Sequence, residues 1–291
     1  MNVWLITGAS RGLGREIARQ ALDRGDAVVA TARQPQQVAQ ALRGYDDRLL
    51  AVPLDVTDPD QPAAAVQAAV ERFGRIDILV NNAGRGLLGG VEEASSEEVQ
   101  AVFQANVFGL LAVTRSVLPV MRAQKAGRIL NISSVGGFAQ APGWGIYGAT
   151  KFAVEGLSEA LRAEAAPLGI QVVIIEPGSF RTDFLDGNSL HTTRRVIEDY
   201  AATAGHVRSQ AAHRNHTQVN DPVKGAAAIV MIATADSPPA RLQLGADSVA
   251  AVEAKLQQIT EELNTWRELA VSTAYHDTAS PEAAPGHRRS R

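Results

Sequence analysis

Three residues in the middle of the chain have side chains and a spacing suited to proton transfer. Tyr147 and Lys151 stand four residues apart in the run Tyr-Gly-Ala-Thr-Lys, and Ser134 precedes the tyrosine by thirteen residues. Residues i and i+4 of a helix share one face. A lysine beside a phenol favours the phenolate and lowers a tyrosine pKa that is about 10 when unperturbed. Such a tyrosine can exchange a proton with a substrate oxygen; the alternative is a half-buried tyrosine beside a solvated lysine.

The elements that must position these residues follow from the apolar pattern, in which short continuous runs alternate with segments of helical periodicity up to about residue 245. The expected strands are 2–6, 27–31, 48–53, 77–80, 127–132, 170–175 and 241–244. The expected helices are 13–24, 35–43, 60–73, 96–124, 146–166 and 221–235. Continuously apolar strands are typical of parallel sheets that are covered on both faces. The sequence therefore predicts an α/β fold, a doubly wound, seven-stranded parallel sheet of Rossmann type with helices on both faces, over a dinucleotide-binding catalytic domain at 1–245.

Three segments depart from this alternation. Residues 183–220 have few large apolar side chains and begin beyond the carboxyl end of a strand, where open α/β sheets bind ligands. We expect a substrate lid there, with a mobile surface loop as the alternative. Residues 246–276 form an expected C-terminal helical extension, because apolar residues recur in one stripe over 248–270 that must be buried on its own domain or on a second subunit. Residues 277–291 are expected to be a disordered tail.

Composition excludes several classes of function. The 28 basic and 31 acidic residues leave a net charge of −3, which favours neither nucleic acid nor an anionic membrane as partner. The chain has no cysteine, so disulfides, thiolate catalysis and cysteine-bound zinc are excluded. His213 and His216 have helical spacing but no carboxylate close by in sequence, so no metal site is expected. No apolar run approaches the length of a membrane span and no signal peptide is apparent, so we expect a soluble, cytoplasmic protein.

A glycine-rich turn follows the first expected strand and opens the first helix. Its sequence is Thr7-Gly-Ala-Ser-Arg-Gly-Leu-Gly14, with the spacing G-x-x-x-G-x-G. Glycines there allow a tight turn and a close approach of backbone to a pyrophosphate at a helix N-terminus. The expected cofactor contacts are Thr7, Gly8, Ser10, Arg11, Gly12, Leu13 and Gly14.

The end of the second strand indicates which nicotinamide cofactor binds. NAD-binding folds carry an acidic residue there, about twenty residues after the glycines, to hold the ribose hydroxyls. This chain has Ala32-Arg33 instead, nineteen residues past Gly14. Arg33 and Arg11 can flank a 2′-phosphate, since a guanidinium matches phosphate geometry. We therefore expect NADP(H) in preference to NAD; the alternative is that both arginines are solvated surface residues.

Further short motifs follow in order along the chain. They are Asp55-Val56 after the third strand, Asn81-Asn82-Ala83-Gly84 after the fourth, Asn106, Asn131-Ile-Ser133-Ser134 at the end of the fifth, Tyr147-x-x-x-Lys151, and Pro177-Gly178 with Thr182 after the sixth. Together with Thr7–Gly14, this ordered set resembles the short-chain dehydrogenase/reductase family, in its single-domain NAD(P)-binding branch. The resemblance covers about residues 2–182, and residues 221–245 follow it more loosely.

The resemblance implies a role for each matching residue. For the cofactor, it implies that Asp55 and Val56 contact the adenine and that Asn82, Ala83 and Gly84 pack beside the bound molecule. Lys151 binds the nicotinamide ribose, and Tyr147 lies next to the cofactor. The residues by the carboxamide and phosphates are Pro177, Gly178, Phe180 and Thr182. On the catalytic side, Tyr147 is the proton donor and Ser134 hydrogen-bonds the substrate oxygen. Asn106 kinks its helix and holds a water that joins Lys151 to solvent.

The implied activity is an NADP(H)-dependent oxidoreductase that interconverts a ketone or aldehyde and an alcohol by hydride transfer, with Tyr147 as general acid and base. The alternative is a catalytically idle NADP(H)-binding sensor or scaffold. A nucleotide-sugar epimerase or dehydratase is disfavoured, because such relatives usually carry another glycine spacing and a larger C-terminal domain. Members of the family are often oligomers, so we expect a homodimer or homotetramer that uses the long helices at 96–124 and 146–166.

The substrate is a small carbonyl or alcohol whose identity the sequence leaves open. Expected substrate contacts are Ser134, Gly136, Trp144, Tyr147 and Phe184. Four arginines of the lid, at 194, 195, 208 and 214, would suit an acidic or acyl-carrier-linked substrate. The alternative is a solvated lid surface.

Overall fold

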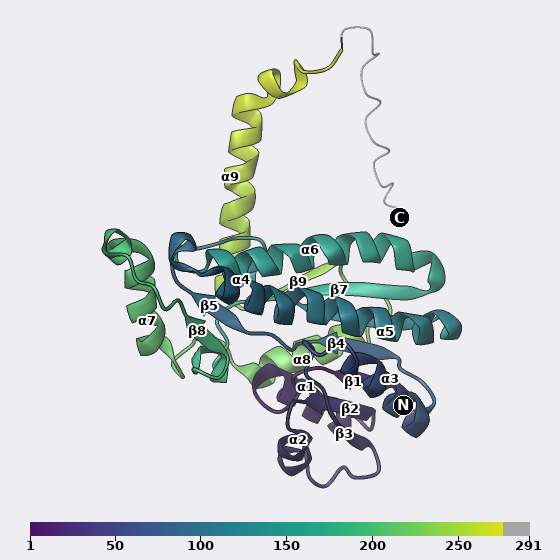
Figure 1. The fold of residues 1–291 in the computed structure, drawn as a ribbon. Coiled ribbons are helices and arrows are strands. Elements are labelled where there is room, and N and C mark those ends of the chain that lie inside the picture. Colours follow the sequence, from purple (N-terminus) through teal and green to yellow (C-terminus); the bar gives the residue numbers. More distant parts are fainter. Residues whose placement is uncertain (276–291) are drawn as a thin grey trace. The chain divides into compact units, whose positions relative to one another are not determined.

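The computed structural model describes residues 1–275, and Figure 1 shows how its elements are arranged. The strands are β1 (Val3–Ile6), β2 (Ala27–Ala32), β3 (Leu49–Pro53), β4 (Ile78–Asn81), β5 (Gly86–Leu88), β6 (Gly127–Ile132), β7 (Ile170–Pro177), β8 (Leu190–Thr192) and β9 (Arg241–Leu244). The α-helices are α1 (Gly12–Asp23), α2 (Pro35–Ala41), α3 (Gln61–Phe73), α4 (Ser96–Phe103), α5 (Gly109–Gln124), α6 (Gly145–Ala165), α7 (His206–Arg214), α8 (Pro222–Ala233) and α9 (Ala246–Val271).

Seven parallel strands form the central sheet, in the order β3-β2-β1-β4-β6-β7-β9. Each expected strand is present within two residues of its predicted ends, which confirms the predicted doubly wound α/β fold. The strand order reverses between β1 and β4, because the chain first adds strands on one side of β1 and then on the other. Open α/β sheets bind ligands at the carboxyl ends of the strands beside such a reversal.

Helices bury both faces of the sheet, and β1 explains why the strands are apolar throughout. Trp4 packs in one buried cluster with Ile17 of α1 and Ile229 of α8. Its neighbour Leu5 belongs to a second cluster, with Val117 of α5. Successive side chains of a strand point to opposite faces, so a sheet covered on both sides needs an apolar residue at every position. Figure 1 shows α5 and α6 lying along one face of this sheet.

The long helix expected at 96–124 is interrupted once. A capping box of Ser95 and Glu98 starts α4, and a π-helical turn at Gln104–Phe108 then separates α4 from α5. By length and composition, Ser96–Gln124 could cross a membrane, since it has 29 residues and an 18-residue window with a mean hydropathy of 1.4. Half of that window is buried inside the fold, as in a core helix.

Residues 183–220 contain more regular structure than a surface loop. β8 pairs in parallel with β5 to form a second, two-stranded sheet, and α7 follows. The sequence predicted neither of these strands nor α7. Each strand has only three residues, and α7 has the polar sequence His-Val-Arg-Ser-Gln-Ala-Ala-His-Arg, so neither shows a clear apolar period.

The chain divides into two compact units, Met1–Val252 and Glu253 onward. The first unit includes the start of α9, so it extends seven residues past the predicted boundary at 245. Along the rest of α9, Leu256, Ile259, Leu263, Trp266 and Leu269 are 43–63 % exposed. The expected burial of this stripe stays a prediction. The predicted disordered tail, 277–291, lies outside the described residues.

Candidate active site

The turn between β1 and α1 has room for an anion and donors to hold it. Gly8 and Gly12 have left-handed φ values of 67° and 55°, which strain any residue with a side chain. A Cβ on Gly14 would lie 2.4 Å from the Asn82 side-chain nitrogen, so glycine allows α1 to start this close to the end of β4. No side chain caps the N-terminus of α1, and its first turn has no acidic residue. Its free N–H groups and the positive end of its dipole therefore fit the pyrophosphate of a dinucleotide.

A cavity of about 1530 Å³ lies along the carboxyl ends of the strands. The predicted site residues that line it are Gly8, Ser10, Arg11, Gly12, Leu13, Arg33, Asp55, Val56, Asn82, Ala83, Gly84, Ser134, Gly136, Trp144, Tyr147, Lys151, Pro177, Gly178, Phe180, Thr182 and Phe184.

Thr7, Gly14 and Asn106 are the predicted residues that do not line this cavity. The Thr7 hydroxyl accepts hydrogen bonds from the backbone N–H groups of Asn82 and Ala83, each at 2.9 Å. The Asn82 amide in turn donates to the carbonyl of Thr7 at 2.9 Å. Thr7 and Gly14 thus join the glycine-rich turn to the end of β4 and shape the cavity wall from behind.

Ser134, Tyr147 and Lys151 meet on one wall of the cavity. Ser134 lies just after β6, and its hydroxyl oxygen accepts a hydrogen bond from the Gly136 N–H at 3.1 Å. Tyr147 and Lys151 lie on one face of α6, with the lysine nitrogen 5.8 Å from the centre of the tyrosine ring. This nitrogen donates to the backbone carbonyl of Ile132 at 2.8 Å.

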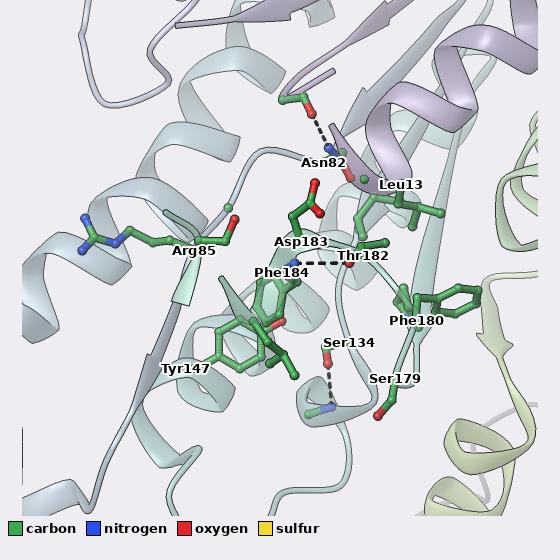
Figure 2. A pocket seen from close by; sticks show the side chains of 18 of the residues that line it. Leu13, Asn82, Arg85, Ser134, Tyr147, Ser179, Phe180, Thr182, Asp183 and Phe184 are labelled. Atoms are coloured by element: carbon green, nitrogen blue, oxygen red, sulfur yellow. Dashed lines mark hydrogen bonds between the residues drawn. The ribbon is translucent and has the colours of Figure 1, made fainter. Parts of the chain in front are cut away.

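Aromatic side chains enclose the Tyr147 ring on two sides. Trp144 meets it edge-on with 5.7 Å between ring centres, and Phe184 lies at the same distance in a tilted arrangement. Figure 2 shows Phe184 beside Tyr147, with Ser134 on the same side of the pocket. An apolar enclosure excludes water from the phenol oxygen and strengthens any hydrogen bond made there.

The pKa of Tyr147 differs from the prediction. Burial disfavours the phenolate and raises the pKa of Tyr147 to about 12, and a hydrogen bond with the Ser134 hydroxyl opposes this only in part. Burial also lowers the pKa of Lys151 to about 8, against the attraction of Glu155. Lys151 is therefore mostly protonated at pH 7, and Tyr147 is fully so. The direction is thus opposite to the predicted lowering, because burial outweighs the hydrogen bond with Ser134.

Asn106 is buried in the π-helical turn, behind the wall that carries Ser134, Tyr147 and Lys151. Its amide exchanges two hydrogen bonds with the backbone of Arg85, at 2.8 and 2.9 Å, and donates to the Thr150 hydroxyl at 3.0 Å. A Cβ on Gly84 would lie 3.1 Å from the Asn106 side-chain oxygen and 3.9 Å from the Lys151 nitrogen. Asn106 and Lys151 thus both lie close to the same side of Gly84, a placement compatible with the implied water link between them.

Cationic side chains gather at the end of the cavity beside β2. Arg33 follows β2, lines the cavity and has no acidic partner in the described part of the chain. Arg11 donates to the hydroxyl of Ser189, just before β8, at 2.7 Å. His191 of β8 lines the same cavity, and burial together with the charges of Arg85 and Arg33 lowers its pKa. The positive charge at this end therefore comes from arginines, where Arg11 and Arg33 were expected to hold a phosphate, and the lowered pKa of His191 favours its neutral form.

Three of the four lid arginines pair with glutamates outside the lid. Arg208 binds Glu93, Arg194 lies 3.5 Å from Glu98, and Arg195 lies 3.9 Å from Glu92. Arg214 lines the cavity and has no such pair within the residues described. Most of the basic charge of the lid thus serves to attach it to the 92–98 segment, and only Arg214 remains for the predicted contact with an acidic substrate.

The structure also brings together residues that the sequence did not connect. Asp183, Asp186 and His216 place their ligand-type atoms within 4.8 Å of one another. His213, the expected neighbour of His216, hydrogen-bonds the Ser209 carbonyl instead. The two carboxylates lie some thirty residues before His216, so no spacing signal could reveal this cluster. In it, Asp186 accepts from the Asn215 amide and lies 3.3 Å from His216, which joins the two ends of the lid.

Comparison with known proteins agrees with these motifs. The family model described as short chain dehydrogenase matches residues 2–192. The chain belongs to the short-chain dehydrogenase family. It is 38 % identical over 273 residues to Oxidoreductase BOA17 of Botryotinia fuckeliana, covering 94 % of this chain and 99 % of that protein. It is 38 % identical over 242 residues to 3-ketodihydrosphingosine reductase of Bacteroides thetaiotaomicron, covering 83 % and 87 % of the two chains.

Solved structures of short-chain dehydrogenases share the fold. One from Streptomyces avermitilis is 39 % identical, with a TM-score of 0.87, over 94 % of this chain and all of the other. One from Burkholderia phymatum, in complex with NAD, is 25 % identical with a TM-score of 0.78, over 90 % and 95 % of the chains. ElxO with NADP bound is 25 % identical with a TM-score of 0.71, over 86 % and 99 %. These relatives support an oxidoreductase with a nicotinamide cofactor.

Proposed function

We propose that this short-chain dehydrogenase is an NADP(H)-dependent oxidoreductase that interconverts a ketone or aldehyde and the corresponding alcohol. One observation carries the proposal. Ser134, Tyr147 and Lys151 line one wall of a cavity that also contains the glycine-rich turn, so proton-transfer groups and an anion site open into one space. A protein that only binds a nucleotide has no need of side chains that transfer a proton. A small-molecule carbonyl as substrate, a homo-oligomeric assembly and a cytoplasmic location complete the proposal.

The reduction needs donors at the carbonyl oxygen. The bound nicotinamide supplies a hydride to the carbonyl carbon, and negative charge then develops on the oxygen. The Ser134 oxygen already accepts from the Gly136 N–H, so its own proton is available to donate into the cavity. Tyr147, protonated because burial raises its pKa, donates a second hydrogen bond and then the proton itself. Hydrogen bonds that become stronger as charge develops on the substrate oxygen lower the barrier to the reaction.

Lys151 supports the tyrosine from behind. Its ammonium is held by the Ile132 carbonyl and lies near the Tyr147 ring, so it stabilises the phenolate that remains after proton transfer. Two further N–H groups of the ammonium are free for the hydroxyls of the nicotinamide ribose. In the oxidative direction the same phenolate accepts the alcohol proton.

The preference for NADP(H) rests on the residues after β2. An acidic residue there would hold the ribose hydroxyls of NAD and repel a 2′-phosphate. Arg33 occupies that place, Arg11 lines the same cavity, and both are free of acidic partners in the described chain. Asp55, a carboxylate of the cavity lining just after β3, already accepts hydrogen bonds from the N–H and hydroxyl of Thr57.

The test is reduction of a panel of ketones and aldehydes by the purified protein, followed as loss of NADPH absorbance, with NADH in parallel. We expect turnover of at least one carbonyl and a higher kcat/KM with NADPH than with NADH. Tight binding of NADPH without reduction of any carbonyl would contradict the enzyme and favour the sensor or scaffold. If carbonyls are reduced but kcat/KM is higher with NADH than with NADPH, only the cofactor assignment is contradicted.

A further inference from the structure

The part of α9 that belongs to the second unit carries a row of exposed apolar side chains. Its members are Leu256, Ile259, Leu263, Trp266 and Ala270. The first four are 43–62 % exposed, and every residue of α9 from 256 to 271 is exposed. Most helices in proteins are stabilised by the packing of an apolar face, because a lone helix of this length is only marginally stable in water. The row therefore needs a partner.

The spacing of the row is that of a coiled coil. Its members follow one another at intervals of 3, 4, 3 and 4 residues, so Ile259 and Trp266 occupy the d positions of a heptad and the other three the a positions. The flanking e and g positions carry polar side chains at Lys255, Thr260, Glu262 and Arg267, and an apolar one only at Leu269. A helix that packs on a globular core usually has a wider apolar face, whereas a narrow a/d row is the seam of a coiled coil. The row thus fits another helix with the same spacing.

The chain supplies such a helix only as a second copy of α9. No other helix in the described residues has more than two large apolar side chains that are exposed. The two on α6, Phe152 and Leu157, are five residues apart, and the two on α8, Val223 and Met231, are eight apart, so neither pair has heptad spacing. A coiled coil of two identical helices is self-complementary, since each a or d side chain fits between four residues of the facing helix.

Two charged residues beside the row indicate how the helices are oriented. Glu262 is at a g position and Arg267 is at the next e position, five residues later, so the two lie on different sides of one helix. In a parallel pair of helices in register, Glu262 of each copy faces Arg267 of the other, which gives this ion pair twice. An antiparallel pair that aligned the apolar rows would bring Glu262 of one copy against Glu262 of the other. Charge complementarity therefore favours the parallel pair.

We propose that α9 of one copy packs in parallel and in register on α9 of a second copy, as a short coiled coil. This inference rests on the homo-oligomeric assembly in the proposed function and names the surface through which the copies meet. It differs from the surfaces expected from the sequence, which were the helices at 96–124 and 146–166. Leucine at a and isoleucine at d favour bundles of more than two helices, so further copies can join the same seam.

The first experiment measures the mass of the full chain in solution by light scattering after size-exclusion chromatography. The double variant Leu256→Glu/Leu263→Glu places charges at two a positions. We expect its mass to be about half that of the wild type or less, because pairing would bury carboxylates that have no partner. The matched control is Gln257→Glu/Asn264→Glu, which adds the same charges at b positions on the outer face of the helix and should keep the wild-type mass.

The second experiment uses the absence of cysteine from the chain. A single introduced thiol can form a disulfide only with the same residue of another copy, and only where the two Cα atoms lie about 4.4–6.8 Å apart. Ile259→Cys and Trp266→Cys, made as separate variants, should each give a covalent dimer on oxidation, seen by non-reducing electrophoresis. Glu261→Cys, on the outer face of the same helix, should give none. This test stands even if the charged double variant does not fold.

Three results would overturn the inference. A wild-type chain with the mass of a monomer at micromolar concentration would mean that the row is covered within one copy. An unchanged mass of Leu256→Glu/Leu263→Glu would mean that the copies meet through other surfaces. A disulfide at only one of positions 259 and 266 would mean that the helices are antiparallel. Reduction of ketones by the wild type is measured separately, and its failure would contradict the proposed enzyme without changing any of these masses or disulfides.

Discussion

Arg208 of α7 binds the carboxylate of Glu93, which lies 115 residues earlier in the chain and is only 2 % exposed. The same carboxylate accepts from the backbone N–H groups of Gly90, at 2.6 Å, and Ile197, at 2.9 Å. Burial alone would raise the pKa of Glu93, but these N–H groups and Arg208 together hold it below its usual value. One buried glutamate thus attaches both the backbone at Ile197 and helix α7 to the body of the fold. Helix α7 in turn forms part of the cavity wall.

Arg208→Gln should loosen this attachment. It leaves the buried Glu93 charge without its cation, a change that typically costs about 3–5 kcal/mol. We expect a higher ketone KM and faster proteolysis within 183–220, with the dissociation constant of NADPH changed much less. Arg194→Gln is the control, because Arg194 is 84 % exposed and its ion pair should contribute little. Equal effects of the two substitutions would show that α7 is held by other contacts.

Arg33→Asp should change the cofactor preference. The substitution replaces a cation by the acid that suits ribose hydroxyls and repels a 2′-phosphate. We expect the ratio of kcat/KM for NADPH to that for NADH to fall by about 10²-fold, which corresponds to roughly 2.7 kcal/mol. Steady-state kinetics with both cofactors measure it, with Arg43→Asp, at an exposed position outside the cavity lining, as a charge control. An unchanged ratio would remove Arg33 from the phosphate site.

The pH dependence should report Lys151. Burial lowers the pKa of Lys151 to about 8, so its ammonium is present below that pH and is lost as the pH rises through it. Reduction needs both this cation and a protonated Tyr147, whose pKa of about 12 keeps it protonated throughout. We therefore expect kcat/KM for NADPH to be level near pH 6–7 and to fall above about pH 8. Values that stay level up to pH 10 would contradict the assignment, and Lys151→Arg should move the fall to higher pH.

A buried charge cluster away from the cavity should control stability. Arg241 lies 3.0 Å from the Glu155 carboxylate and 3.3 Å from that of Glu176, both of which are buried. Burial raises the pKa of each glutamate. The contribution of these two groups to the free energy of unfolding is therefore fully present at low pH, where they are protonated, and is lost as the pH rises through the raised pKa values. Arg241→Gln should raise these pKa values further and lower the free energy of unfolding by about 3 kcal/mol at pH 7.

The loss should be smaller at pH 5, where the glutamates of the Arg241→Gln protein bind protons. Urea unfolding at the two pH values measures the difference. Arg75→Gln, which removes an ion pair whose arginine is 54 % exposed, should cost little at either pH. A loss of stability that is the same at pH 5 and pH 7 would contradict the account of the cluster.

The sheet and the convergence of most predicted site residues on one cavity were predictable, because their signals are local. The seven strands are continuous apolar runs, and Thr7–Gly14 is a turn whose glycines meet steric limits within a few residues. Parallel strands bring their carboxyl ends to one edge, so motifs at those ends converge without further information. Asn82 and Gly14 illustrate this, since their contact follows from the pairing of β1 with β4.

The lid and the electrostatics of the site were not predictable in the same way. The β5–β8 pair joins three-residue strands that lie about a hundred residues apart, and Arg208 and Glu93 pair across a similar distance in sequence. The pKa of Tyr147 depends on how much water the surrounding aromatic rings exclude, which no spacing reveals.

The most direct test of the central claim is Tyr147→Phe, which removes the phenol oxygen and keeps the ring between Trp144 and Phe184. A positioned general acid is typically worth about 10²–10⁴-fold in rate. We predict a fall of that size in single-turnover reduction of a ketone, with the dissociation constant of NADPH within about twofold of wild type. Reduction at the wild-type rate by Tyr147→Phe would contradict the claim that this tyrosine donates the proton.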